Sequence, residues 1–75
     1  MAIDIWVYFN DVPGGGTEQR IQTLAKEHGG QWWGEGTTLA TMERDNSFDF
    51  PDSNAADRFL EAVGPLLHRF TRKGG

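Results

Sequence analysis

The chain contains no cysteine, which excludes disulfide bonds, thiol nucleophiles and thiolate metal ligands. Its two histidines, His28 and His68, have no neighbouring ligand at the spacing of a metal-binding pair. Neither Ser47 nor Ser53 lies in a nucleophile motif, and nothing in the sequence marks a pocket that would perturb a carboxylate. We therefore predict no catalytic residue, no metal ion, no cofactor and no enzymatic activity.

Long apolar segments are also absent. No run of the sequence approaches the roughly 20 residues that a membrane-spanning helix needs. The first segment, MAIDIWVYF, has no basic region and contains Asp4, so it does not have the pattern of a signal peptide. We therefore expect a cytoplasmic protein that does not associate with a membrane.

Basic residues are few, because seven lysines and arginines stand against 11 aspartates and glutamates, and the formal net charge is −4. An acidic surface repels phosphates, which disfavours direct binding of nucleic acid. It suits a protein partner with a basic surface. The chain is short, and we predict one domain over residues 1–75 with a frayed C-terminal tail at residues 72–75.

Residues 47–63 predict a short strand that leads directly into an amphipathic helix. Phe48 and Phe50 alternate with polar residues, which is the period of a strand with one buried face. Pro51 has no N–H group to donate and ends the strand. The next three residues, DSN, are all good N-cap residues, and apolar residues then follow at helical spacing up to Val63.

Another strand is expected over Ile3–Phe9, where aliphatic residues alternate with polar and aromatic ones. We predict that the aliphatic row faces the core and that Trp6 and Tyr8 point to the other side. A loop rich in glycine follows. A helix is then expected from Thr17, which can cap it, to His28, and the glycine pair after His28 ends it.

Gln31–Phe50 predicts a hairpin with its turn near residues 44–46. An alternative turn at Glu35-Gly36 would give three short strands instead. The adjacent Trp32 and Trp33 point to opposite faces of a strand, so we expect one in the core and the other exposed.

The C-terminal segment has two interpretations. Gly64-Pro65 should break or kink the preceding helix. Either Pro65 begins a further helical turn, or Leu67–Thr71 forms a short final strand. The sequence pattern leaves both open.

The order strand, helix, strand, strand, helix, with a possible fourth strand, predicts an α+β domain with both helices on one face of an antiparallel sheet. Over residues 3–63 this order, with Phe-x-Phe followed by Ala-x-x-Phe, resembles the ferredoxin-like split β-α-β fold. The resemblance implies a fold and transfers no active site. RNA-recognition-motif domains share the layout and stack bases on open-face aromatics. Asp49 stands here where such a platform needs an aromatic or cationic residue.

The sheet face away from the helices is the candidate binding surface. It would carry Trp6 and Tyr8 with carboxylates around them, the composition of an interaction surface. The alternatives are that the C-terminal segment or a second copy of the chain covers these aromatics. Trp33 beside Glu35 would line a surface groove, or Trp33 would only shield the sheet.

Acidic residues are concentrated between residues 43 and 61, where they form either a solvated face or a docking surface for a basic partner. The predicted partner-binding residues are Asp4, Trp6, Tyr8, Trp33, Glu35, Glu43, Asp45, Asp49, Asp57 and Glu61.

These features predict a small acidic protein that binds another protein and has no catalytic activity. Its size, acidity and fold resemble those of the small inhibitor proteins of bacteriophages, such as the anti-CRISPR proteins. That resemblance implies an inhibitor in the host cytoplasm that occupies a basic, nucleic-acid-binding surface of a host complex. The alternatives are a self-associating or structural subunit of a larger assembly, including a homodimer, and a single-stranded nucleic-acid binder.

Overall fold

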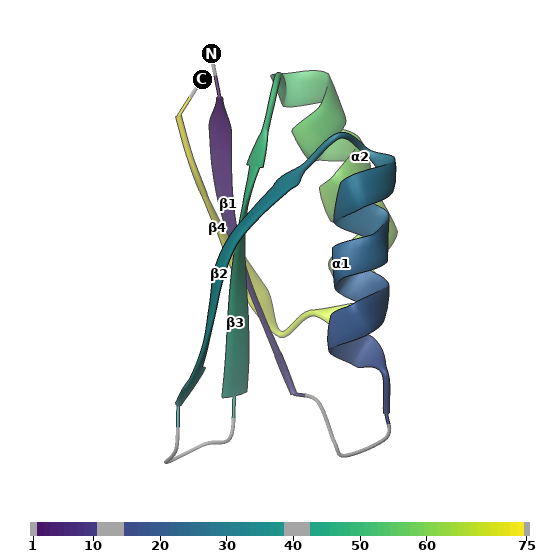
Figure 1. Ribbon diagram of the computed structural model, residues 1–75, viewed down its shortest axis with the longest axis vertical. Coiled ribbons are helices and arrows are strands. Elements are labelled where there is room, and N and C mark those ends of the chain that lie inside the picture. The colour runs from purple at the N-terminus through teal and green to yellow at the C-terminus, as the bar shows by residue number, and fades with distance from the viewer. Residues whose placement is uncertain (1, 11–14, 39–42, 75) are drawn as a thin grey trace.

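The computed structural model describes residues 2–10, 15–38 and 43–74, with the side chains of residues 35, 37 and 38 left out. Along these ranges the chain alternates strands and helices (Figure 1). The elements are β1 (Ile3–Asn10), α1 (Thr17–Glu27), β2 (Gln31–Thr38), β3 (Glu43–Phe50), α2 (Ser53–Val63), the short 3-10 helix η1 (Gly64–Leu66) and β4 (Arg69–Lys73).

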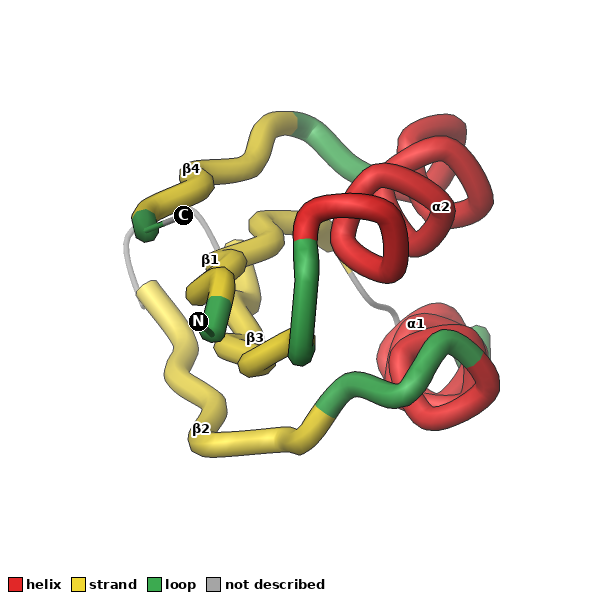
Figure 2. The backbone as a smooth tube through the Cα atoms, turned by 90° about the horizontal axis from the view of Figure 1, so that it is seen from above, coloured by secondary structure: helices red, strands yellow, loops and turns green. Residues whose placement is uncertain are grey.

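The four strands form one sheet in the order β2-β3-β1-β4, and each neighbouring pair is antiparallel. Both helices lie on the same side of this sheet (Figures 1 and 2). The described part of the chain thus leaves the other side of the sheet open. The prediction of an α+β domain with an antiparallel sheet and both helices on one face is confirmed.

The central strand β1 divides its side chains between the two faces as the alternation predicts. Ile3, Ile5, Val7 and Phe9 are at most 1% exposed and face the helices. The residues between them are only partly buried, and they include Trp6 and Tyr8. Burial of the aliphatic row therefore fixes the aromatic pair on the opposite face.

Three phenylalanines form the centre of the core between the sheet and α2. The ring of Phe59 lies 5.4 Å from that of Phe48 and 4.7 Å from that of Phe50, between centroids. Of the three possible N-cap residues, Asp52 caps α2, because its side chain accepts a hydrogen bond of 2.8 Å from the N–H of Ala55. The cap and the aromatic cluster together fix where α2 begins and which face it buries.

The predicted helix over residues 17–28 is α1, with small differences at its ends. Its N-cap is Gly16, whose φ of 74° is left-handed, and Thr17 is the first helical residue rather than the cap. The helix ends at Glu27, and Gly29 follows with a φ of 80°, a conformation that glycine adopts at low cost.

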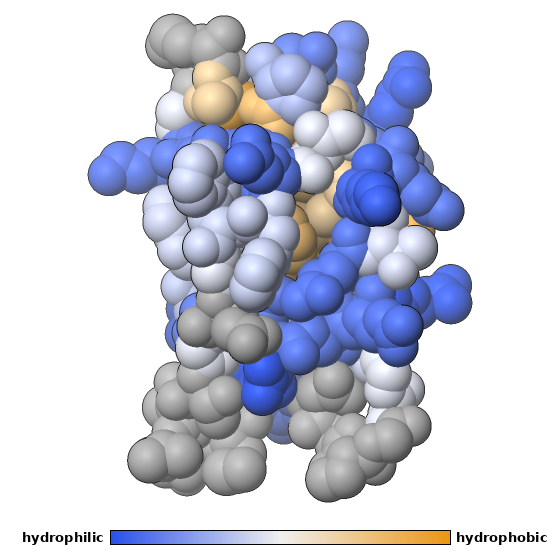
Figure 3. Space-filling view, viewed as in Figure 1, coloured by the Kyte–Doolittle hydropathy of each residue, from blue (hydrophilic) through white to orange (hydrophobic). Residues whose placement is uncertain are grey.

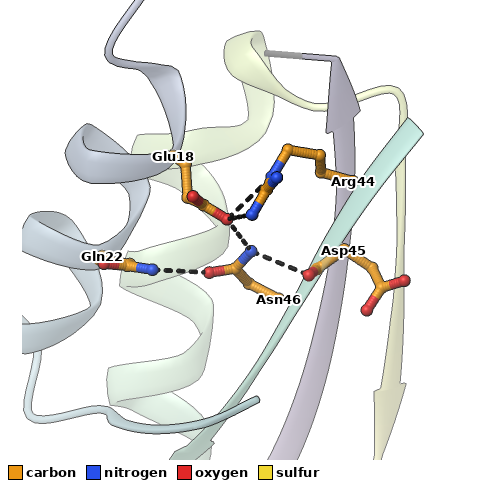
Figure 4. Close-up of polar contacts among 5 residues, drawn as sticks. All are labelled: Glu18, Gln22, Arg44, Asp45 and Asn46. Atoms are coloured by element: carbon orange, nitrogen blue, oxygen red, sulfur yellow. Dashed lines mark hydrogen bonds and ion pairs between the residues drawn. The ribbon is translucent and has the colours of Figure 1, made fainter. Parts of the chain in front are cut away.

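A buried polar cluster holds α1 against β3 (Figure 4). The side chain of Asn46 is fully buried; it accepts from Gln22 at 3.0 Å and donates to Glu18 at 3.0 Å. Arg44 forms an ion pair with the same Glu18 oxygen at 2.8 Å. Because a buried amide without partners is costly, this cluster fixes the position of α1 over the sheet.

The predicted hairpin is formed by β2 and β3, but its turn is not where the sequence placed it. Residues 44–46 lie within β3, where Asn46 pairs with both Val7 and Glu35. The alternative turn at Glu35-Gly36 is also wrong, since both residues lie within β2. The polar residues at positions 44–46 resemble a turn in the sequence. In the structure they lie on a strand, because Arg44 and Asn46 form hydrogen bonds with side chains of α1.

Neither tryptophan of β2 is in the core, so the prediction that one of them is buried is wrong. Trp32 is 49% exposed and Trp33 is 62% exposed. Among the residues that the structure describes, β2 has one neighbour in the sheet, β3, and a bulge shifts its register between Trp32 and Gly34. An edge strand leaves such large side chains without enough cover.

Both interpretations of the C-terminal segment hold in part. Pro65 lies in the first turn of η1, and β4 then begins at Arg69, two residues later than the predicted strand. The prediction of a frayed tail is wrong for Arg72 and Lys73, because they pair with Ile5 and Asp4 of β1.

Candidate binding surface on the open sheet face

We call the side of the sheet opposite the helices the open face. The pairing of β1 with β3 and with β4 shows which residues of these three strands lie on the open face. They are Asp4, Trp6 and Tyr8 of β1, Glu43, Asp45, Ser47 and Asp49 of β3, and Arg69, Thr71 and Lys73 of β4. The predicted neighbours of Trp6 and Tyr8 are therefore present, and β4 adds three residues that the sequence analysis did not place there.

A hollow of about 280 Å³ lies at one end of the open face. We call it the tryptophan hollow. The residues that line it are Asp4, Trp6, Trp33, Ser47, Phe48 and Asp49. The groove expected at Trp33 is thus present, and it joins β2 to the aromatic side of β1.

Two glycines of β2, Gly34 and Gly36, lie opposite open-face residues of β3. Gly34 pairs with Ser47, which in turn pairs with Trp6. Gly36 pairs with Asp45, and a Cβ atom at Gly36 would lie 3.2 Å from the Asp45 carboxylate. The glycines that weaken β2 as a strand therefore give the open face room beside Trp33.

Two carboxylates stand side by side at the edge of the tryptophan hollow. Asp4 of β1 is the direct cross-strand partner of Asp49 of β3. A side-chain hydrogen bond with Asp49 is the main cause that raises the pKa of Asp4, followed by burial and by the charge of Asp49, while Lys73 opposes the shift. No ion pair joins either aspartate to a basic side chain in the described residues.

The other end of the open face is arranged differently, around Tyr8. The guanidinium carbon of Arg69 lies 3.7 Å from the centroid of the Tyr8 ring. Arg69 also donates to Glu43 at 3.2 Å, and Nδ1 of His68 lies 3.5 Å from the other Glu43 oxygen. Tyr8 and Glu43 therefore make contacts within the chain. Their role in partner binding stays a prediction.

The remaining predicted acids do not form one surface. Asp57 and Glu61 lie on α2, on the helix side of the sheet, and Asp57 accepts from Arg72 of β4. Asp45 lies on the open face at the Tyr8 end, directly opposite Tyr8. The acids that the sequence groups between residues 43 and 61 are thus divided between two faces, because strand and helix turn them in different directions.

The side chain of Glu35 lies outside the described residues. Its backbone pairs with Asn46, and the bulge at Trp33 breaks the two-residue period on which its shared face was predicted. Sequence reasoning also missed Arg69 and Lys73. A final strand at Leu67–Thr71 was one of the two interpretations of this segment, but the polar sequence of residues 69–73 does not show which side chains face the open side.

Trp32 lies on the helix side, where it lines a second hollow of about 350 Å³ between β2 and α1. Figure 3 shows apolar surface in the gap between the sheet and helix layers, with hydrophilic residues around it. Trp32 and Trp33 thus point to opposite faces, as predicted for adjacent residues of a strand.

No protein-family model matches the chain, and no curated protein matches it either. Within residues 2–10, 15–38 and 43–74, no helix is long and apolar enough to cross a membrane. The same residues contain no group of three His, Cys, Asp or Glu side chains that could hold a metal ion. We therefore infer the binding properties of the open face from its own side chains.

Proposed function

We propose that the chain is a small protein-binding module, without enzymatic activity, whose open face docks on a basic surface of another protein. The observation that carries this proposal is the tryptophan hollow, in which Trp6 and Trp33 stand beside the aspartate pair. Exposed large aromatics next to charge are typical of interaction sites.

The two kinds of side chain would have separate tasks in binding. Tryptophans supply a large contact area at low cost in side-chain entropy, and they dominate the free energy of many interfaces. Carboxylates speed the encounter with a basic partner and set its orientation. Because exposed charges are screened over about 10 Å at 0.1 M salt, binding of this kind weakens as salt is added.

The fold is proposed to be ferredoxin-like. From its other edge the sheet has the order β4-β1-β3-β2, and the two crossovers place both helices on one face. Small size and a net charge of −4 support the further proposal of an anti-CRISPR-like inhibitor. Such an inhibitor would occupy the surface with which a host complex holds nucleic acid.

Self-association is the second candidate, and the edge strand β2 favours it. Its backbone has one free edge, and Trp32 and Trp33 are both largely exposed there. Light scattering at micromolar concentration would detect a dimer, and a monomer would exclude this candidate. Direct binding of single-stranded nucleic acid is disfavoured, since Asp4 and Asp49 would repel phosphates beside the aromatics.

Affinity capture with the immobilised chain tests the proposal. We expect a partner with a basic surface, retained at low salt and released at high salt. Trp33→Ala should weaken its retention by about 30-fold, since truncating a central tryptophan typically costs about 2 kcal/mol. Trp32→Ala is the matched control, because Trp32 lies on the same strand but on the helix side.

Circular dichroism would verify that both variants fold. Retention that does not respond to salt would contradict the electrostatic part of the proposal. Equal losses for Trp32→Ala and Trp33→Ala would contradict the open face as the docking surface.

A further inference from the structure

The two ends of the open face contain similar groups, and one end already holds a cation. At the Tyr8 end, a guanidinium group stacks on an aromatic ring and donates to a carboxylate, and it comes from Arg69 of the chain itself. At the tryptophan hollow, aromatic rings and carboxylates are present, and Lys73 lies opposite Asp4 on β4. Its charge lowers the pKa of Asp4, but no ion pair joins Asp4 or Asp49 to a basic side chain of the described residues, and none of these stacks on Trp6 or Trp33.

We propose that the tryptophan hollow binds the guanidinium group of an arginine side chain of the partner protein. This inference deepens the proposed function and rests on it, since it names the group that the open face recognises.

The geometry of the aspartate pair suits a guanidinium. Asp4 and Asp49 are direct cross-strand partners, so their carboxylates present several acceptor oxygens on one side of the hollow. A guanidinium has five N–H donors in a planar fork and can bond two carboxylates at once. Binding a cation would also relieve the repulsion that contributes to the raised pKa of Asp4.

The tryptophans suit the flat face of the same group. Guanidinium stacks on aromatic rings and is more weakly hydrated than an ammonium, so it loses less on entering such a site. The volume of about 280 Å³ is at the lower limit for pockets that hold small molecules, which are about 300 Å³ or more. It therefore fits a single side chain better than a larger ligand.

Lysine is the nearest competitor. Its ammonium group is a compact, strongly hydrated charge without a flat face, so it would gain attraction from the aspartates and little from stacking. We therefore expect the hollow to prefer arginine over lysine by about tenfold, which corresponds to one strong charge-assisted interaction.

Short peptides with the sequence acetyl-Gly-X-Gly-amide, with X as arginine, lysine or citrulline, would test this on the free protein. Citrulline keeps the planar shape of arginine but lacks its charge. Two-dimensional NMR would follow the indole N–H signals. We expect the arginine peptide to shift the signals of Trp6 and Trp33, to leave that of Trp32 in place, and to bind with a millimolar Kd.

Matched variants separate the site from general attraction to an acidic protein. Asp49→Asn and Trp33→Ala should each weaken binding of the arginine peptide about tenfold or more. Asp57→Asn removes the same charge from α2, and Trp32→Ala removes the same ring from the other face, so neither should change it.

Equal binding of the arginine and citrulline peptides, or equal losses for Asp49→Asn and Asp57→Asn, would overturn the inference. So would equal affinity for arginine and lysine. If the arginine peptide fails to bind while capture of a basic partner still depends on Trp33, this inference is wrong and the proposed function stands. If the peptide binds as expected but no partner is captured, the hollow is an arginine site and the proposed function is wrong.

Discussion

The two ends of the open face differ in whether a basic side chain of the chain itself stacks on the aromatic ring. Near Tyr8, Arg69 stacks on the ring and pairs with Glu43, so a cation of the chain itself contacts the aromatic ring at this end. Near Trp6 and Trp33, two aspartates stand together at the edge of a hollow. At the Tyr8 end the aromatic ring and a carboxylate thus bind an arginine of the chain itself. At the other end the aromatic rings and carboxylates line a hollow that a partner's side chain could enter.

The pairing of β1 with β4 produces this difference. Tyr8 of β1 lies opposite Arg69 of β4. Trp6, two residues before Tyr8 on β1, lies opposite Thr71. Threonine is uncharged and too short to cover an indole ring. Lys73 of β4 lies opposite Asp4, but it forms no ion pair with Asp4 among the described residues. A change of one side chain on β4 should therefore convert one end into the other.

The largest effect is expected from Thr71→Arg, which would place a guanidinium next to Trp6 as Arg69 stands next to Tyr8. The internal cation should reduce affinity for the arginine peptide about tenfold or more by NMR titration. It should also stabilise the fold by about 0.5–1 kcal/mol in denaturant unfolding, the value of an exposed cation–π contact. Thr71→Gln, of similar length without charge, is the control and should retain binding.

Arg69→Ala should have the opposite effect at the Tyr8 end. Loss of the stacking contact and of the pair with Glu43 should destabilise the fold by about 1 kcal/mol, measured by urea unfolding. Because the face of the Tyr8 ring is uncovered, the arginine peptide should bind a second, weaker site there. Arg69→Lys keeps the charge and should lose only the stacking part; a loss as large as that of Arg69→Ala would show that the pair with Glu43 contributes nothing.

The smallest effect is expected from Asp49→Asn at neutral pH. The pKa of Asp4 is raised in the folded protein, so folding favours its protonated form. The stability that this provides is complete below the ordinary pKa of an aspartate and is lost as the pH rises through the raised value. Removing the second carboxylate should therefore raise the melting temperature slightly at pH 7 and not at low pH.

NMR titration of Asp4 in the same variant gives a direct measurement. Its pKa should fall, since the repulsion disappears and an asparagine amide can donate to the carboxylate. Asp45→Asn, on the same strand but not opposite Asp4, should leave the titration of Asp4 unchanged. An unchanged pKa in Asp49→Asn would show that the two aspartates do not interact.

Much of the fold could be predicted from local patterns. The alternation along residues 3–9 predicted which side chains of β1 are buried, and Pro51 and Asp52 predicted the end of β3 and the start of α2. The hairpin turn was misplaced because Arg44 and Asn46 look like turn residues. Their partners are on α1, 26 and 24 residues away in the sequence, and no local pattern contains that information.

The candidate site was predictable only in part. Trp6 followed from the alternation of β1. For Trp33 the sequence left two interpretations open, a groove or a shield over the sheet, and the structure shows it lining a hollow. The division of the acids between the open face and α2 could not be predicted from their spacing. The role of β4 was also missed, because a five-residue polar segment forms a strand only where a neighbour such as β1 supplies its hydrogen bonds.

The amino-acid sequence by itself determined which side chains must be buried, since apolar residues at strand and helix periods are driven out of water wherever the chain folds. It thereby determined that Trp6 and Tyr8 face away from the helices. Only the tertiary structure decided what lies beside them. Strand register and the bulge in β2 set Arg69 against Tyr8, Thr71 against Trp6 and Trp33 beside the aspartates, because pairing between distant segments is a property of the whole sheet.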